Sequence, residues 1–167
     1  MKTKRNKDEM PPITDGIKAK GFFKLNIINQ DGSVAGSTGW KKNQIVNTGY
    51  QDFLMYLLAG SAGSIRPSHA ALGTGTAPAS AATSLPGELT EATARMALTT
   101  GTGGSKTVNY TFTLNSGIIA AASTIQNVGL FSGSTQGGGT LFAGNTYATS
   151  SLATNQAVNG TYAIAFA

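Results

Sequence analysis

Apolar and polar residues alternate along several short segments of this chain, and this period of two narrows the possible folds more strongly than composition or charge does. The clearest case is the segment Thr107–Leu114, in which Val108, Tyr110 and Phe112 alternate with threonine and asparagine. Successive side chains of a β-strand point to opposite faces, so an alternating segment buries one face and leaves the other in water. We therefore expect antiparallel strands that each cover part of a hydrophobic core.

Comparable patterns recur along the chain, separated by glycine, serine and asparagine residues that favour turns. They lie at 21–28, around Val34, and at 40–46, 70–72, 95–99, 125–131, 140–143 and 161–166. The Asp31-Gly32 pair is a strong hairpin signal. About eight or nine short strands with glycine-rich turns are typical of a β-sandwich. The sequence thus predicts an all-β fold, an antiparallel β-sandwich of jelly-roll-like or Ig-like type, over residues 20–167.

One segment departs from this period and has helical spacing instead. Its apolar residues recur at i, i+3, i+4, i+7 and i+8, and they are Tyr50, Phe53, Leu54, Leu57 and Leu58. Thr48 and Gln51 have the spacing of a capping box, and Gly60 is placed to end the helix. We therefore predict one short amphipathic helix at about 48–59 that packs on the sheet, because a helix of this length is marginal alone.

We expect the core to be filled by large apolar residues on one face of the predicted strands and helix. These residues are Phe23, Leu25, Phe53, Leu57, Tyr110, Phe112, Tyr162 and Ile164. Trp40 is the only tryptophan, and we expect it to pack in the core or in an interface.

Charge is distributed very unevenly along the chain. Residues 1–42 hold nine of the 12 Lys and Arg residues and four of the seven Asp and Glu residues, and no such residue follows Lys106. A free monomer usually keeps charged groups on its surface for solubility. The charge-free final third therefore favours a surface that neighbouring subunits cover, and a homo-oligomer. A Ser/Thr/Asn-coated surface that is soluble without charge remains the alternative.

Residues 1–19 are expected to form an extended arm, since they combine mixed charge, a Pro11-Pro12 pair and little periodicity. Its basic residues are candidate partner contacts, and they are Lys2, Lys4, Arg5 and Lys7. Asp8 and Glu9 follow at once, and no aromatic residue comes before Phe22. Nucleic-acid contact by the arm is therefore disfavoured.

The loop from Gly73 to Gly87 is a second candidate contact, beginning with Gly73, Thr74, Gly75 and Thr76. This segment lacks the third glycine and the following helix of a dinucleotide site. Segment 101–107 likewise lacks the glycine before its lysine that a phosphate-binding loop requires, and a strand pattern follows it, so we predict a hairpin there.

Residues suited to catalysis are scarce, and we expect no enzymatic activity, metal site or cofactor. The chain has no cysteine, and its only histidine, His69, is expected to lie in a loop. Glu88, Glu91 and Arg95 form the only charge cluster in the middle of the chain. We expect one carboxylate to pair with Arg95 and to fix the long loop to the following strand. The N-terminus lacks the apolar stretch of a secretion signal, and no apolar run is long enough to cross a bilayer.

Four stretches in a fixed order resemble small structural proteins of tailed-bacteriophage virions. They are 21–25 with Asp31-Gly32; 40–49; 71–78 with Leu85, Glu88 and Arg95 downstream; and 128–131 and 139–142 before the closing strand 161–166. The resemblance spans roughly residues 21–166 and implies a β-sandwich piece of a tail, fibre, neck or capsid surface, assembled in the host cytoplasm with other virion proteins. The charge-free end departs from the family pattern, which implies a more deeply embedded or more tightly oligomeric version.

Within this resemblance, a tail, fibre or neck component is the favoured role, and a capsid-decorating or cement protein is the alternative. A further alternative is a glycan- or receptor-binding module, in which a loop aromatic such as Tyr147 stacks on a sugar ring.

Overall fold

Ten strands and one helical segment form the regular structure of this protein in a computed structural model, which describes residues 18–54, 66–90 and 95–166. The strands are β1 (Ala19–Ile28), β2 (Val34–Ser37), β3 (Lys41–Ile45), β4 (His69–Gly73), β5 (Met96–Ala97), β6 (Thr99–Thr102), β7 (Thr107–Leu114), β8 (Ser123–Phe131), β9 (Leu141–Leu152) and β10 (Ala157–Phe166). The helical segment is η1 (Gly49–Leu54). The predicted all-β fold is therefore confirmed.

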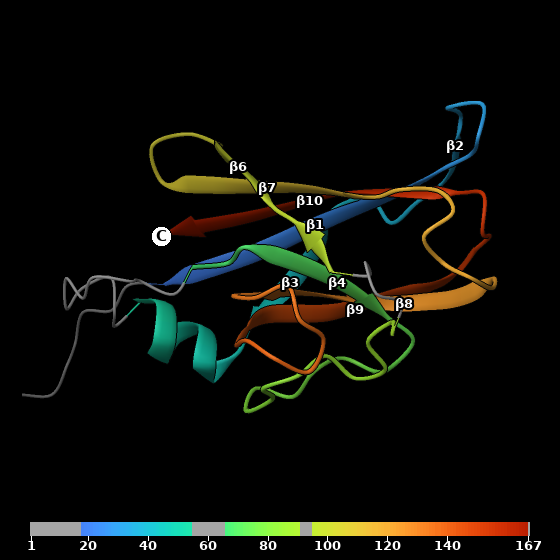
Figure 1. The fold of residues 1–167 in the computed structure, drawn as a ribbon. Helices are drawn as coiled ribbons and strands as arrows, with labels where there is room; N and C mark the ends of the chain where they lie inside the picture. The colour runs from blue at the N-terminus through green and yellow to red at the C-terminus, as the bar shows by residue number, and fades with distance from the viewer. Residues whose placement is uncertain (1–17, 55–65, 91–94, 167) are drawn as a thin grey trace, which may run out of the picture.

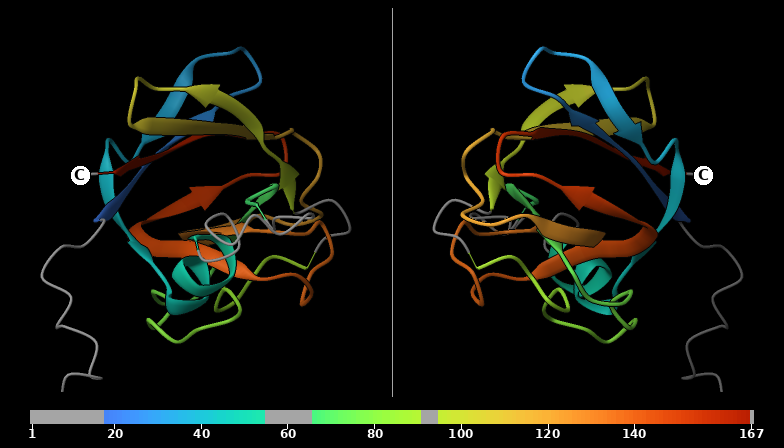
Figure 2. Two further views of the ribbon diagram at one scale, coloured as in Figure 1. Left: turned by 90° about the vertical axis from the view of Figure 1, so that its left-hand side faces the viewer. Right: turned by 90° about the vertical axis from the view of Figure 1, so that its right-hand side faces the viewer.

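The strands form one nearly closed, antiparallel sheet. Their order is β5-β4-β8-β9-β3-β1-β10-β7-β6, and β2 pairs with β1 outside this path. The first and last strands of the order, β5 and β6, are separated in the chain by Leu98 alone. β1, β10, β7 and β6 lie in one layer and β4, β8 and β9 in the other, with β3 pairing to both β1 and β9 (Figure 1). Figure 2 shows the strands wrapping around a common interior.

Burial follows the alternation that the sequence contains. In β7, Tyr110, Phe112 and Leu114 are buried, whereas Thr111 and Thr113 are exposed. Six of the expected core residues lie in the core, and they are Phe23, Leu25, Tyr110, Phe112, Tyr162 and Ile164. The side chains of Phe53 and Leu57 lie outside the described part of the chain.

Three aromatic rings join the two layers at the centre of the core. Phe23 of β1 lies beside Tyr162 of β10 in a stacked arrangement, with ring centroids 6.0 Å apart. On its other side, Phe23 makes an edge contact with Tyr147 of β9 in the opposite layer, with centroids 5.9 Å apart. Aromatic pairs at these distances add stability beyond the area that they bury.

Trp40 does not lie in the core. It is 56% exposed, so of the two placements expected for it the core is wrong, and the interface stays a prediction. Trp40 immediately precedes β3, and it shares a parity with Lys42, whose exposed side chain lies opposite Phe22 on β1. Trp40 itself lies in the bend between β2 and β3 and in neither strand, so strand alternation does not bury it.

Within the described residues, a helical stretch at 47–48 leads into η1 (Gly49–Leu54), and residues 55–59 of the predicted helix lie outside the description. Thr48 donates its hydroxyl to the carbonyl of Leu141 on β9, at 2.7 Å, and so ties the segment to the sheet instead of capping it. Gly49 is required here, because a Cβ would lie 2.2 Å from the carbonyl oxygen of Phe142.

Several boundaries differ from those predicted. The first strand begins at Ala19, one residue inside the predicted arm, and residues 1–17 lie outside the described part. His69 is the first residue of β4 and not a loop residue. β9 extends to Leu152, although the alternation predicted a strand only to 143. Small polar residues at 148–151 give little hydropathy contrast, so pairing with β8 decides this half of the strand.

The turns predicted at Asp31-Gly32 and at 101–107 are both present. Asp31 accepts hydrogen bonds from the backbone N–H and the hydroxyl of Ser33, and these bonds lower the pKa of its carboxyl. Gly32 has a positive φ of 83°, which suits glycine. Segment 101–107 joins β6 to β7 as an antiparallel hairpin.

We expect Gly160→Ala to destabilise the protein by about 1–3 kcal/mol, because a Cβ at this position would overlap the Phe112 ring on the neighbouring strand. Gly101→Ala on β6 is the matched control, because a Cβ there would meet no atom within 4 Å. Urea unfolding of both variants measures the difference. Equal stability of the two would show that the ring moves aside without cost.

Candidate functional site

A buried ion pair fixes the long loop that follows β4. Arg95 donates from Nε to Oε1 of Glu88 at 2.5 Å and from Nη2 to Oε2 at 2.9 Å. The two side chains are only 2% and 7% exposed. The structure thus brings together two of the three residues expected in this cluster, while Glu91 lies outside the described part.

The guanidinium also holds the turn between β8 and β9. Its Nη1 donates to the carbonyls of Gly133 and Gly138, at 3.0 and 2.7 Å, and its Cζ lies 3.8 Å from the centroid of the Phe131 ring. A buried charge is tolerated where its donors are satisfied. Arg95 therefore links the loop, the sheet and the β8–β9 turn.

Asn127 of β8 holds the other side of the same loop, a role that was not expected from the sequence. This fully buried side chain donates to the carbonyls of Thr76 and Pro86, at 3.0 and 2.8 Å. A Cβ on Gly73 would lie 2.4 Å from its Oδ1. An asparagine directly before the apolar run Val128–Phe131 was the available signal, but its partners are more than 40 positions away.

The candidate contact loop is therefore anchored at its base and presents mainly small side chains outward. Gly73 is buried, Gly75 is half-buried, and Thr74 and Thr76 are exposed. The backbone N–H of Thr74 bonds to the carbonyl of Gly87 at 2.9 Å, which closes the loop at its base.

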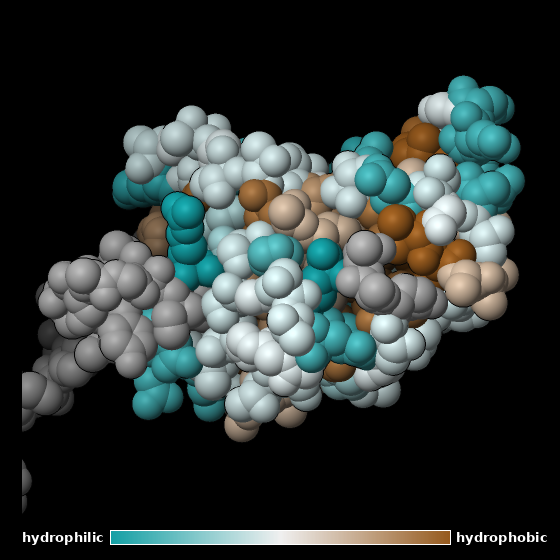
Figure 3. All heavy atoms as spheres, viewed as in Figure 1, coloured by the Kyte–Doolittle hydropathy of each residue, from teal (hydrophilic) through white to brown (hydrophobic). Residues whose placement is uncertain are grey.

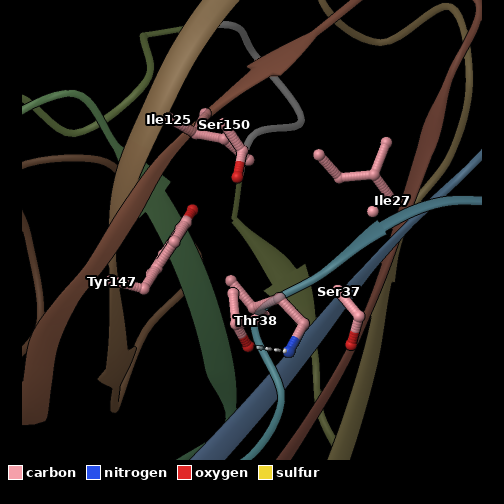
Figure 4. Close-up of a pocket in the computed structure, with 8 residues that line it drawn as sticks. Ile27, Ser37, Thr38, Ile125, Tyr147 and Ser150 are labelled. Atoms are coloured by element: carbon pink, nitrogen blue, oxygen red, sulfur yellow. Dashed lines mark hydrogen bonds between the residues drawn. The ribbon is translucent and has the colours of Figure 1, made fainter.

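A narrow pocket opens between the β1–β2 hairpin and β9. Its cavity volume is about 10 Å³, room for roughly one water molecule and far below the size of usual small-molecule sites. Its lining residues are Leu25, Ile27, Gly36, Ser37, Thr38, Ile125, Tyr147 and Ser150. Figure 4 shows Ile27, Tyr147 and Ser150 around this space, and the dashed line marks the bond from the backbone N–H of Leu25 to the Thr38 hydroxyl.

Tyr147 is a buried strand residue, so its assignment as a loop aromatic that stacks on sugars is wrong. Its side chain is 8% exposed, and its hydroxyl has no partner among the described residues. Burial raises the pKa of this phenol.

A second, shallow groove lies at the loop end of the sheet. Its lining residues include no aromatic ring, and they are Gln30, Ser116, Gly117, Ile119, Ala120, Thr154 and Asn155.

Charge is distributed unevenly among the strands. None of the strands from β5 to β10 carries Asp, Glu, Lys or Arg. By contrast, β1 and β3 carry Lys20, Lys24, Lys41 and Lys42. The side seen in Figure 3 is mostly pale, and the strongly hydrophilic atoms at its upper right lie over the turn between β1 and β2.

The described residues offer few groups for proton transfer. Their carboxylates are Asp31 in a turn, Asp52 on η1 and Glu88 in the ion pair. No group of three metal-ligating side chains occurs among these residues. Within the same ranges, no helix is long and apolar enough to cross a bilayer.

No family model, no curated protein and no solved structure matches this chain.

We expect removal of either partner of the buried ion pair to cost about 3–5 kcal/mol, because the other charge is left buried and unpaired. Arg95→Met and Glu88→Leu are the single variants, and the double variant is expected to lose much less than their sum. Arg66→Met, which removes an exposed charge, is the control. Additive losses in chemical denaturation would contradict this energetic coupling.

Stability should also fall on mild acidification. Burial, with a smaller contribution from the nearby Arg95, lowers the pKa of His69 below its ordinary value. The folded state therefore favours the neutral imidazole. The neutral imidazole of His69 therefore contributes to the free energy of unfolding. This contribution is fully present above the unfolded-state pKa of about 6.5 and is lost as the pH falls through the lower folded-state pKa. The melting temperature measured from about pH 7.5 to 5.5 should drop, and the drop should shrink in His69→Gln.

Proposed function

We propose that this protein is a non-enzymatic structural component of a tailed-phage virion, placed in a tail, fibre or neck. One observation carries the proposal: no strand from β5 to β10 has a charged side chain. The proposal also takes over the resemblance of the four sequence stretches to virion proteins.

The outer face of β6, β7 and β10 is suited to being covered. Thr111 lies opposite both Thr99 and Thr161, so three threonines form a row across these strands. In the next row, the Thr113 hydroxyl donates to Oδ1 of Asn159 at 3.0 Å. Covering hydroxyl and amide groups costs far less than covering charges, because their hydrogen bonds are readily exchanged for others across an interface.

The proposal has three further parts, which concern the body, the arm and the loop after β4. The body is a jelly-roll-like or Ig-like β-sandwich that packs against copies of itself, as symmetric oligomers commonly do. The basic arm, with Lys2, Lys4, Arg5 and Lys7, reaches onto a neighbouring virion protein. The anchored loop that begins at Gly73 supplies a rigid secondary contact.

Capsid decoration is the second candidate, since an uncharged outer face suits a capsid lattice as well as a tail. The two roles differ in copy number. A tail or fibre protein occurs in small multiples set by rotational symmetry of about three or six, whereas a decorating protein occurs in on the order of hundreds of copies.

Particles purified from a culture that produces this chain should contain it at a fixed copy number, measured by quantitative mass spectrometry. Thr111→Lys and Asn159→Lys should fold normally, because both side chains are exposed, yet enter particles at much lower occupancy. The physical reason is that each variant places a charge in the covered face.

Asn155→Lys is the matched control, since it adds the same charge at an exposed turn between β9 and β10. Absence of the wild-type chain from particles would refute the proposed function. Full incorporation of Thr111→Lys would show that this face is not an interface.

A further inference from the structure

We propose that the outer face of β1 and β3 docks an acidic surface of a different protein, with Trp40 as the apolar anchor. This face, called the lysine face below, consists of Lys20, Phe22, Lys24, Trp40 and Lys42. The inference rests on the proposed function, in which the chain contacts neighbouring proteins, and names the chemistry of one such neighbour.

Strand register brings Lys20, Phe22, Lys24 and Lys42 onto one side of the sheet. Lys42 of β3 lies opposite Phe22 of β1, and Lys20 and Lys24 flank Phe22 at positions of the same parity. Trp40 lies in the bend that leads into β3, and continuing the register of Phe23 with Lys41 by one residue places it beside Lys24. Lys20 and Lys24 are about 13 Å apart along the strand, at about 3.3 Å per residue.

The lysine face has the anatomy of a protein interface. Trp40 is 56% exposed and Phe22 is half-buried, so a large apolar surface lies among ammonium groups. Interfaces commonly hold an aromatic side chain at their centre, which contributes most of the binding energy, and charged residues around it that steer association. A lone exposed tryptophan in a folded domain is otherwise a solubility cost.

Charge determines the nature of the partner. The ion pair between Glu88 and Arg95 is the one formed among the described residues, so no described carboxylate neutralises the lysine face. A second copy of the chain would bring the same positive face. Its remaining described carboxylates, Asp31 and Asp52, lie apart on a turn and on η1. Among the described residues, a second copy therefore offers no acidic surface, and we infer that the complementary surface belongs to a different, acidic protein.

An acidic protein fits this face better than a nucleic acid does. Single-stranded nucleic acids are bound in grooves where several aromatic rings stack on successive bases. Here one indole is exposed, and neither of the two hollows described above is lined by the lysine face. All the cations are lysines, without the arginine fork that reads phosphates and base edges.

Trp40 makes the test direct, because the emission of the single tryptophan reports on this face alone. The purified full chain is titrated with three probes at low and high salt: poly-glutamate, a glutamate–tyrosine copolymer and oligo-deoxythymidine. We expect both acidic polypeptides to shift the emission, the copolymer to bind more tightly, and high salt to weaken both. Tighter binding of oligo-deoxythymidine would overturn the proposal in favour of a nucleic-acid site.

Variants separate specific docking from general attraction to a basic protein. Lys20→Ser, Lys24→Ser and Lys42→Ser combined should weaken copolymer binding by about tenfold or more, whereas Arg66→Ser, which removes an exposed charge before β4, should have little effect. Trp40→Ala, followed by anisotropy of a labelled probe, should abolish the preference for the copolymer over poly-glutamate. Equal losses in the lysine and Arg66 variants, or a preference unchanged in Trp40→Ala, would refute the proposal.

These measurements need no particle, so their outcome is independent of the incorporation test. If these measurements refute the lysine face proposal, the uncharged face of β6, β7 and β10 still supports assembly. Conversely, absence from particles would remove the virion role while leaving an acidic-protein site to be explained.

Discussion

Phe23 packs between Tyr162 and Tyr147, and this contact holds the two layers of the fold together. It joins β1 and β10 of one layer to β9 of the other, and all three side chains are buried. Because a sheet must bury one face against something, closing the strand order on itself satisfies both layers at once. The outer faces that remain are then set by the residues of opposite parity, and these residues carry the proposed functions.

Arg95 plays a comparable part for the loops. Its guanidinium joins Glu88, two carbonyls of the β8–β9 turn and the Phe131 ring, and Asn127 holds the same loop from the opposite side. Buried polar groups of this kind contribute little net stability, but they favour one arrangement when every partner is present. The loop after β4 is therefore a fixed part of the surface.

The uncharged face and the lysine face are suited to two different kinds of contact within an assembly. Threonine and asparagine on β6, β7 and β10 give an uncharged face that copies of the chain can cover, while lysines and Trp40 on β1 and β3 give a face suited to an acidic neighbour. The change from one to the other occurs between β10 and β1, which are adjacent strands. A subunit with unlike faces is able to make unlike contacts.

Local alternation and turn chemistry were enough to predict the strand content, the buried face of β1, β7 and β10, and the turn at Asp31-Gly32. Only the tertiary structure showed three further features, namely the burial of Tyr147, the exposure of Trp40 and the hydrogen bonds of Asn127 to a distant loop. Each of these depends on contacts between segments far apart in the chain, such as β9 beside β3 and β8. Local pattern contains no information about those neighbours, since strand order is set by long-range packing.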